Sequence, residues 1–197
     1  MQPSDVTNQQ GLEFFGCVVT AFSITAEGSA DGGQYKWSAT LQTGKKPDLA
    51  STAEPTITAY ANTTIPLLSS SSGHKVFNVN VILSSFTTSI ESPAVFTGVA
   101  SDGYQVVSRG AEISVTADAQ VKYDGNTKGF INSFDTQSSA LSGNMLVITN
   151  NNAFGVAMPN GVLTNVALAE GDLMMLDCSI KAVDDGSTAL VTFDVSA

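Results

Sequence analysis

This 197-residue chain holds two cysteines and one histidine, whose thiols and imidazole could act as nucleophiles, as a general base or as metal ligands. Cys17 and Cys178 lie near opposite ends of the sequence, each within a strand-like run. No CxxC or Cys/His spacing of the kind that binds zinc occurs. The two thiols could form a disulfide in an oxidising compartment. We instead expect two buried free thiols that pack as small hydrophobic groups.

The single histidine, His74, follows a Ser-rich segment that ends in Gly73. A Ser-His-Asp arrangement requires a buried and oriented imidazole, which we do not expect after a flexible Ser/Gly segment. The sequence also has no HExxH motif, P-loop or dinucleotide-binding fingerprint. We therefore predict no catalytic residues and no cofactor, and we expect that the protein is not an enzyme.

Clusters of Asp and Gly offer oxygen atoms that Ca²⁺ could use as ligands. They occur at 102–103, 124–126 and 184–186. Asp and Gly are also the residues that turns prefer, and this explanation is favoured, so no metal site is predicted. A glycosidase-type pair of carboxylates stays an open alternative for which the sequence singles out no residues.

The composition favours a protein whose surface is covered by other molecules. Hydrophobic residues make up 43% of the chain, but charged residues only 13%, which is about half the usual share. The net charge of −10 argues against nucleic-acid binding through clustered Lys and Arg. The sequence shows no signal peptide and no apolar run of about 20 residues. We expect a soluble protein made in the cytoplasm, with no membrane partner.

The elements that would position these residues are strands, because alternation with period two dominates the sequence and long helical patterns are missing. One short amphipathic helix is predicted over 127–134. The predicted fold is all-β, a β-sandwich or open barrel of antiparallel strands with one short helix. The predicted strands are 14–26, 35–43, 56–60, 75–86, 95–100, 104–108, 111–123, 145–149, 153–158, 161–169, 172–183 and 189–195.

Alternation also predicts which side chains face the core. In the strand 35–43, Tyr35 and Trp37 lie on one face, where burial in the core explains both. The strand 111–123 is the longest clean one. Its apolar face includes Ile113, Val115 and Val121, which we expect to anchor the core, while Glu112 and Asp118 lie on the opposite face.

The chain is predicted to form a single domain over 11–197, preceded by a flexible arm at 1–10. The segment 44–74 holds three of the six prolines and a run of serines. A loop of this length inside a compact domain is usually functional or disordered. We expect it to contact a neighbouring molecule, and a flexible linker is the alternative.

The order of the elements after residue 75 is distinctive. A Gly-marked bend at Arg109-Gly110 precedes the long strand, which ends in Tyr123-Asp124, and the short helix ends at Phe134. Met158-Pro159, the strand 161–169 and a final hairpin across 184–186 follow. This order resembles that of the tail tube proteins of long-tailed bacteriophages. The early segment FFGCVVTAFSITAE, its hairpin and the GKK at 44–46 are also similar to the first half of such subunits, so the resemblance covers about 11–197.

The resemblance implies a structural virion protein whose copies close into hexameric rings that stack into a hollow tube. It implies that viral DNA passes through the lumen without specific binding, and that terminator and distal tail proteins are further partners. The protein would be assembled in the host cytoplasm and reside in the virion tail. Two alternatives remain: another β-sandwich ring or decoration protein of a virion, and a carbohydrate-binding or adhesin module.

Acidic residues in such a lumen would repel phosphates and let DNA slide. The first candidates for the lumen surface are on the long strand, and a rival set lies at the turn of the 14–43 hairpin. The basic pair after this hairpin and the residues that follow are the candidates for the contact between rings. The lumen candidates are Glu112 and Asp118 with Glu27 and Asp31 as rivals, and the ring-to-ring candidates are Lys45, Lys46, Pro47 and Asp48.

Overall fold

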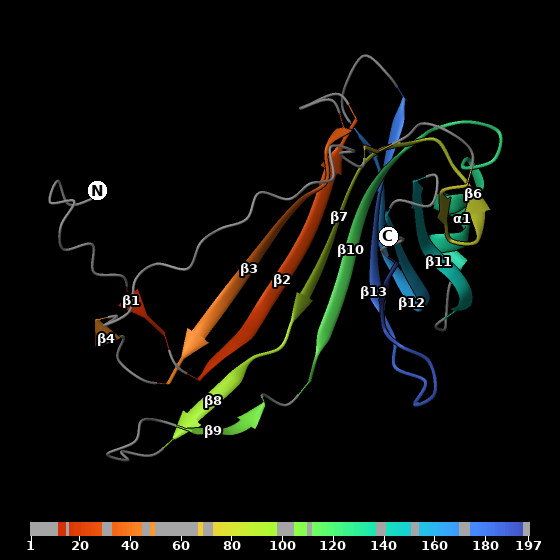
Figure 1. Cartoon of the computed structure of the whole chain (residues 1–197). Coiled ribbons are helices and arrows are strands. Elements are labelled where there is room, and N and C mark those ends of the chain that lie inside the picture. Colours follow the sequence, from red (N-terminus) through yellow and green to blue (C-terminus); the bar gives the residue numbers. More distant parts are fainter. Residues whose placement is uncertain are drawn as a thin grey trace, which may run out of the picture. The chain divides into compact units, whose positions relative to one another are not determined.

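The computed structural model describes residues 12–14, 16–28, 33–44, 48–49, 67–68, 73–97, 105–109, 112–136, 141–150, 154–169 and 174–194. The described chain is all-β with one short helix, as predicted (Figure 1). The helix α1 spans Gly129–Thr136. The strands are β1 (Leu12–Glu13), β2 (Cys17–Glu27), β3 (Lys36–Thr43), β4 (Asp48–Leu49), β5 (Lys75–Val76), β6 (Val79–Asn80), β7 (Leu83–Glu91), β8 (Ala94–Thr97), β9 (Gln105–Arg109), β10 (Ser114–Lys122), β11 (Leu141–Asn150), β12 (Phe154–Ala169), β13 (Met175–Ala182) and β14 (Thr192–Asp194).

Ten of these strands form one sheet in the order β3-β2-β7-β10-β13-β12-β11-β5-β6, with β14 beside β12. Figure 1 shows β3, β2, β7, β10 and β13 as long neighbouring strands in this order. The pairings of β7, β13 and β12 within this series are antiparallel. The strands β1 with β4 and β8 with β9 form two separate pairs. Whether the sheet closes into a sandwich or barrel stays a prediction.

The chain groups into two compact units. The smaller unit comprises 1–21, 39–64 and 92–112, and includes the pairs β1–β4 and β8–β9. The larger unit comprises 22–38, 65–91 and 113–197. The pockets considered below all lie in the larger unit.

The strand β10 shows how alternation builds the core. Val115 and Val121 are buried, as predicted, and Val121 pairs with the buried Leu176 of β13. Ile113, however, is 51% exposed, so the prediction that it anchors the core is wrong. The physical reason is position: β10 begins at Ser114, and Ile113 precedes the first paired residue of the strand.

The predicted single strand 75–86 is wrong. It consists of the hairpin β5–β6 followed by the separate strand β7. The two turn residues, Phe77 and Asn78, have φ angles of 52° and 63°, which fits a type I′ turn. Asn tolerates this region, but a bulky aromatic residue seldom adopts it. The Phe77 ring compensates by packing edge-on against Phe130 of α1 with centroids 5.9 Å apart, and its N–H donates to the carbonyl of Met145.

The strand β12 continues through Pro159, where the sequence predicted two strands. One edge of β12 pairs with β14 up to Ala157 and with β13 from Gly161 onward. Pro159 lies between these two pairings on that edge, where its missing N–H removes no ladder bond to either strand. Gly161 is required by close packing, because an added Cβ would lie 2.8 Å from the carbonyl oxygen of Lys181.

Candidate functional site

One side of the main sheet carries polar residues over five neighbouring strands. The register places Asp118 of β10 between Thr87 of β7 and Ser179 of β13. The next row places Gln120 between Ser85 and Asp177. We call this surface the polar face. It comprises Ser23, Thr25 and Glu27 of β2, Lys36 and Ser38 of β3, Ser85, Thr87 and Ser89 of β7, Thr116, Asp118 and Gln120 of β10, and Asp177, Ser179 and Lys181 of β13.

Hydrogen bonds between neighbouring strands fix the side chains of this face. Ser179 Oγ donates to Asp118 Oδ1 at 2.6 Å, and Gln120 Nε2 donates to Asp177 Oδ1 at 3.0 Å. At the β2–β3 end, the hydroxyls of Ser23 and Ser38 are 2.9 Å apart. The face therefore presents a preorganised layer of hydroxyls, amides and carboxylates.

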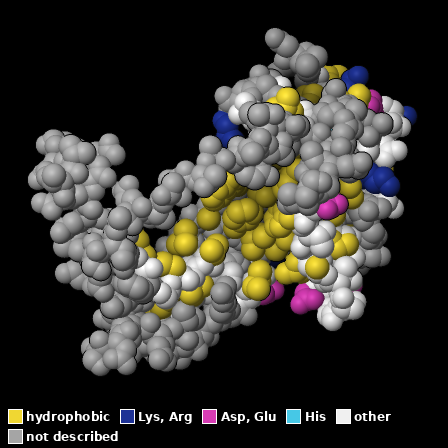
Figure 2. Space-filling view, viewed as in Figure 1, with side chains coloured by type: hydrophobic (Ala, Val, Ile, Leu, Met, Phe, Trp, Pro, Cys, Tyr) yellow, Lys and Arg dark blue, Asp and Glu magenta, His cyan; other side chains and the backbone are white. Residues whose placement is uncertain are grey.

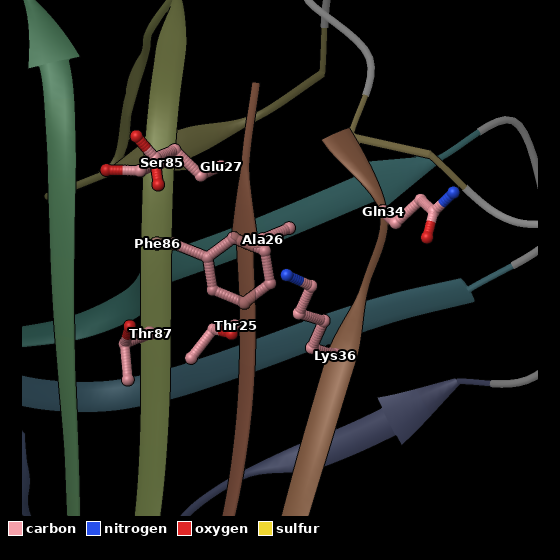
Figure 3. A pocket seen from close by; sticks show the side chains of 8 residues that line it. All are labelled: Thr25, Ala26, Glu27, Gln34, Lys36, Ser85, Phe86 and Thr87. Atoms are coloured by element: carbon pink, nitrogen blue, oxygen red, sulfur yellow. The ribbon is translucent and has the colours of Figure 1, made fainter. Parts of the chain in front are cut away.

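Two hollows lie in this layer. The first, of about 220 Å³, is lined by residues of β2, β3 and β7 (Figure 3). In this view Lys36 reaches from β3 toward β2, while Glu27 extends toward Ser85 of β7. The second hollow, of about 290 Å³, includes Asp118 and Asp177 in its lining. Among the described residues, no group of three or more His, Cys, Asp or Glu could hold a metal ion. The polar face can act through its hydrogen-bonding groups and through the charges of its scattered acidic and basic side chains.

The structure brings together two of the lumen candidates that the sequence treated as rivals. Glu27 and Asp118 lie on the polar face and are exposed. The hairpin and the long strand therefore contribute to one surface instead of two alternative ones. Glu112 is exposed before β10, in the smaller unit.

The remaining predicted site residues are described less fully. Asp48 lies in β4, where its backbone is paired with that of Glu13. Asp31, Lys45, Lys46 and Pro47 are outside the described residues, as are the turn 102–103 and the predicted strand 56–60.

An aromatic groove of about 430 Å³ opens where the core face of the sheet reaches β2 and β3. It is lined by Phe22, Ile24, Tyr35, Lys36, Trp37 and Phe154. Figure 2 shows hydrophobic side chains gathered over this part of the sheet. The prediction that Trp37 is buried in the core is wrong, because its side chain is 72% exposed. β3 is the edge strand of the sheet, so no further strand among the described ones flanks Trp37 on that side.

Aromatic contacts hold the groove in shape. Phe22 stacks on Trp37 with centroids 6.4 Å apart, and Phe193 of β14 packs edge-on against Phe22 at 5.8 Å. Tyr35 packs edge-on against Phe154 at 4.9 Å. Burial raises the pKa of Tyr35 to about 12. Its hydroxyl is enclosed and makes no hydrogen bond within the described structure. The sequence did not single out Phe154 and Phe193, although their aromatic character in strands was the available signal.

The thiols and the imidazole differ from expectation in their burial. Cys17 and Cys178 are both free, as expected, but only Cys178 is buried and Cys17 is exposed. Burial, with a smaller contribution from the neighbouring Asp177 carboxylate, raises the pKa of Cys178 to about 12. His74 is fully buried, which corrects the expectation of a flexible setting. Its backbone carbonyl accepts a hydrogen bond from Val81, which ties it to the β5–β6 hairpin.

Two acidic turns form the loops that their sequence predicted. Asp124 Oδ1 accepts hydrogen bonds from the backbone N–H groups of Asn126 and Thr127. Asp185 Oδ1 accepts from those of Ser187 and Thr188, and these bonds hold the pKa of the Asp185 carboxyl well below its usual range. The carboxylates thus stabilise their own turns.

The comparisons with protein-family models and with curated proteins assign no family to this chain. No protein-family model matches the sequence, and a search of curated proteins found no match. Within the described residues, no helix combines the length and apolarity that a membrane span requires. The polar face and the aromatic groove therefore have to carry the functional argument.

Proposed function

We propose that this chain is a structural subunit that assembles with copies of itself into rings, and that the rings stack into a bacteriophage tail tube. The observation that carries the proposal is the two-sided character of one sheet. Over β3, β2, β7, β10 and β13, one side is the polar face, while the other side is apolar and ends in the exposed aromatic groove. Such a sheet suits a position between water and other protein.

The polar face suits the lumen of the tube. Its side chains are mainly Ser, Thr and other short polar groups, which offer no array of Lys and Arg for phosphate binding. Asp118 and Asp177 place carboxylates at its centre. The polar face also carries Lys36 and Lys181, but these two cations are spread over β3 and β13. In a chain of net charge −10, the face therefore offers DNA no cluster of cations that would hold it.

The edge of the sheet suits assembly. β3 ends the strand order, and an edge strand presents backbone N–H and C=O groups to any strand that approaches. Closure of a ring covers these edges, because a head-to-tail contact repeated around an axis leaves no free end. Hexameric symmetry, terminator and distal tail proteins as further partners, and residence in the virion tail belong to the same proposal and rest on the sequence resemblance.

A carbohydrate-binding module is the second candidate, because Trp37 exposes its ring beside Phe22 and Tyr35. Sugars need polar side chains next to a stacked ring. Since the Tyr35 hydroxyl is enclosed, the polar side-chain groups of the groove lining are limited to the Lys36 ammonium and the Trp37 indole N–H. The assembly function is therefore favoured.

Sedimentation velocity of the purified protein tests the proposal. We expect discrete larger species to grow at the expense of the monomer as the concentration rises, with masses that are multiples of one ring. A single monomeric species over the whole accessible concentration range would contradict the proposal.

A further inference from the structure

Asn160 and Gly161 of β12 form the only Asn-Gly pair in the sequence. An asparagine before glycine loses its side-chain amide most readily, because glycine has no Cβ to hinder attack by its backbone nitrogen. In this reaction the glycine nitrogen bonds to the asparagine Cγ, and ammonia leaves as a cyclic imide forms. Water then opens the imide to aspartate or isoaspartate, so the net change is gain of water and loss of ammonia. The pair is therefore a chemically reactive point of the strand.

The backbone of this pair is held in the extended conformation from both sides. Gly161 is buried, and it pairs with Leu141 of β11 on one edge and with Ala182 of β13 on the other. The Asn160 carbonyl accepts a hydrogen bond from the Val183 N–H at 3.3 Å. Ring closure requires the backbone to turn until the Gly161 nitrogen reaches the Asn160 Cγ. A strand that is paired on both edges reaches this conformation only through local opening.

The side chain of Asn160 is held as well. Its Nδ2, the nitrogen that would leave as ammonia, donates a hydrogen bond to Asp185 Oδ2 at 2.7 Å. The Asp185 carboxylate is itself fixed in its loop. Its Oδ1 accepts from the backbone N–H groups of Ser187 and Thr188, and its Oδ2 also accepts from the Thr188 hydroxyl at 2.8 Å. One carboxylate therefore orders the loop 184–188 and fastens this loop to β12.

We propose that Asn160 is a deamidation site gated by Asp185. In the folded chain, the Asp185 carboxylate and the paired strand keep the amide intact. When the loop 184–188 and β12 open, Asn160 converts irreversibly to aspartate or isoaspartate. The new carboxylate has no N–H to donate and faces a like charge at Asp185, so the loop no longer closes as before. A transient opening thus leaves a permanent mark on the chain. This inference does not depend on the proposed function.

Peptide mapping by mass spectrometry tests the gate, because it separates the amide, aspartate and isoaspartate forms at position 160. The folded parent protein is kept in warm, mildly alkaline buffer beside the same protein unfolded in guanidinium chloride. We expect rapid conversion of Asn160 in the unfolded chain, ahead of the other asparagines, and little conversion in the folded chain. Equal rates in the two states would overturn the protection. Conversion of Asn160 no faster than that of other asparagines in the unfolded chain would overturn the site itself.

Asp185→Ala separates the effect of the carboxylate from that of the paired strand. A hydrogen bond to a charged group is worth about tenfold or more in an equilibrium constant, so conversion of Asn160 in the folded variant should rise to that extent. Asp124→Ala is the matched control, because the Asp124 carboxylate accepts similar bonds within its own turn, from Asn126 and Thr127. Thermal unfolding shows that both variants fold. A rise of equal size in both variants, or in neither, would overturn the role of Asp185.

Exchange of the two side chains gives a readout that does not depend on deamidation. Asn160→Asp alone should lower the midpoint of urea unfolding, since it places two carboxylates together. Addition of Asp185→Asn should restore much of this loss. The amide at position 185 can then donate to the carboxylate at position 160, while its oxygen still accepts from the loop N–H groups. A double variant that is no more stable than Asn160→Asp would overturn the contact on which the gate depends.

Discussion

The ring of Phe22 in β2 stacks on the ring of Trp37 in β3, with centroids 6.4 Å apart and planes inclined by 26°. Phe22 also packs edge-on against Phe193, while Trp37 is mostly exposed. The pair therefore marks the place where the core side of the sheet becomes accessible surface. The hydroxyls of Ser23 and Ser38, one residue further along each strand, meet on the opposite side. Adjacent positions of one hairpin thus serve both surfaces on which the proposed assembly depends.

The two thiols should differ sharply in reactivity. Cys17 is exposed, while Cys178 is buried and its thiol pKa is raised to about 12, so little of the reactive thiolate forms at Cys178 near neutral pH. A thiol reagent at pH 8 should modify one site per native chain, and mass spectrometry should locate it at Cys17. The variant Cys17→Ser should react only after denaturation. Rapid native labelling of Cys178 would contradict its burial.

Alkaline pH should destabilise the fold through Cys178 and Tyr35. Both groups are neutral when protonated, and burial raises their pKa from 9.0 and 10.0, respectively, to about 12. Their contribution to stability is fully present below the unfolded-state values and is lost as the pH rises toward 12, because the unfolded chain ionises first. The midpoint of urea unfolding should therefore fall between pH 8 and pH 11. Cys178→Ala should show a smaller fall, and an equal fall in both proteins would contradict this role for the thiol.

The alternation of apolar and polar residues correctly predicted strands and their buried side chains where the pattern along a strand is regular. Val115 and Val121 of β10 are buried as expected. Alternation assigns residues to a face but does not say how far other elements cover that face. Trp37 was expected in the core for this reason and is exposed, because it lies on an edge strand.

Predictions from the local sequence also failed where a contact with a residue distant in the chain determines the backbone conformation. The turn at Phe77 depends on packing against Phe130, more than fifty residues away in the chain. The burial of His74 likewise depends on the fold around it. At the candidate site, the charge pattern identified Asp118 and Glu27 as lumen candidates, but only the strand order places them on one surface.

Gly161 should be hard to replace. An added methyl group would meet the Lys181 carbonyl oxygen at 2.8 Å and the Ile180 side chain at 3.1 Å. Gly161→Ala should lower the free energy of unfolding by about 1–3 kcal/mol, the usual cost of overpacking, in equilibrium urea unfolding. Gly125→Ala is the matched control, because no atom lies within 4 Å of its added Cβ. Equal stability of the two variants would show that β12 and β13 can separate without cost.

Reversing charge on the polar face should make assembled tubes bind DNA. Asp118→Lys with Asp177→Lys adds positive charge at the centre of this surface, and clustered cations bind phosphates with release of counterions. Short duplex DNA should then be retained by the tubes at low salt and released at high salt. The control Asp184→Lys adds charge at an exposed turn outside the polar face and should retain less. Equal retention by the two kinds of tube would contradict a lumen lined by this face.

The central claim is that copies of this chain form a hollow tube, and negative-stain electron microscopy of the concentrated, purified protein tests it most directly. The account predicts rings with a central hole, or tubes built from such rings. Images that contain only single particles of monomer size, at concentrations where the protein stays folded, would contradict the account.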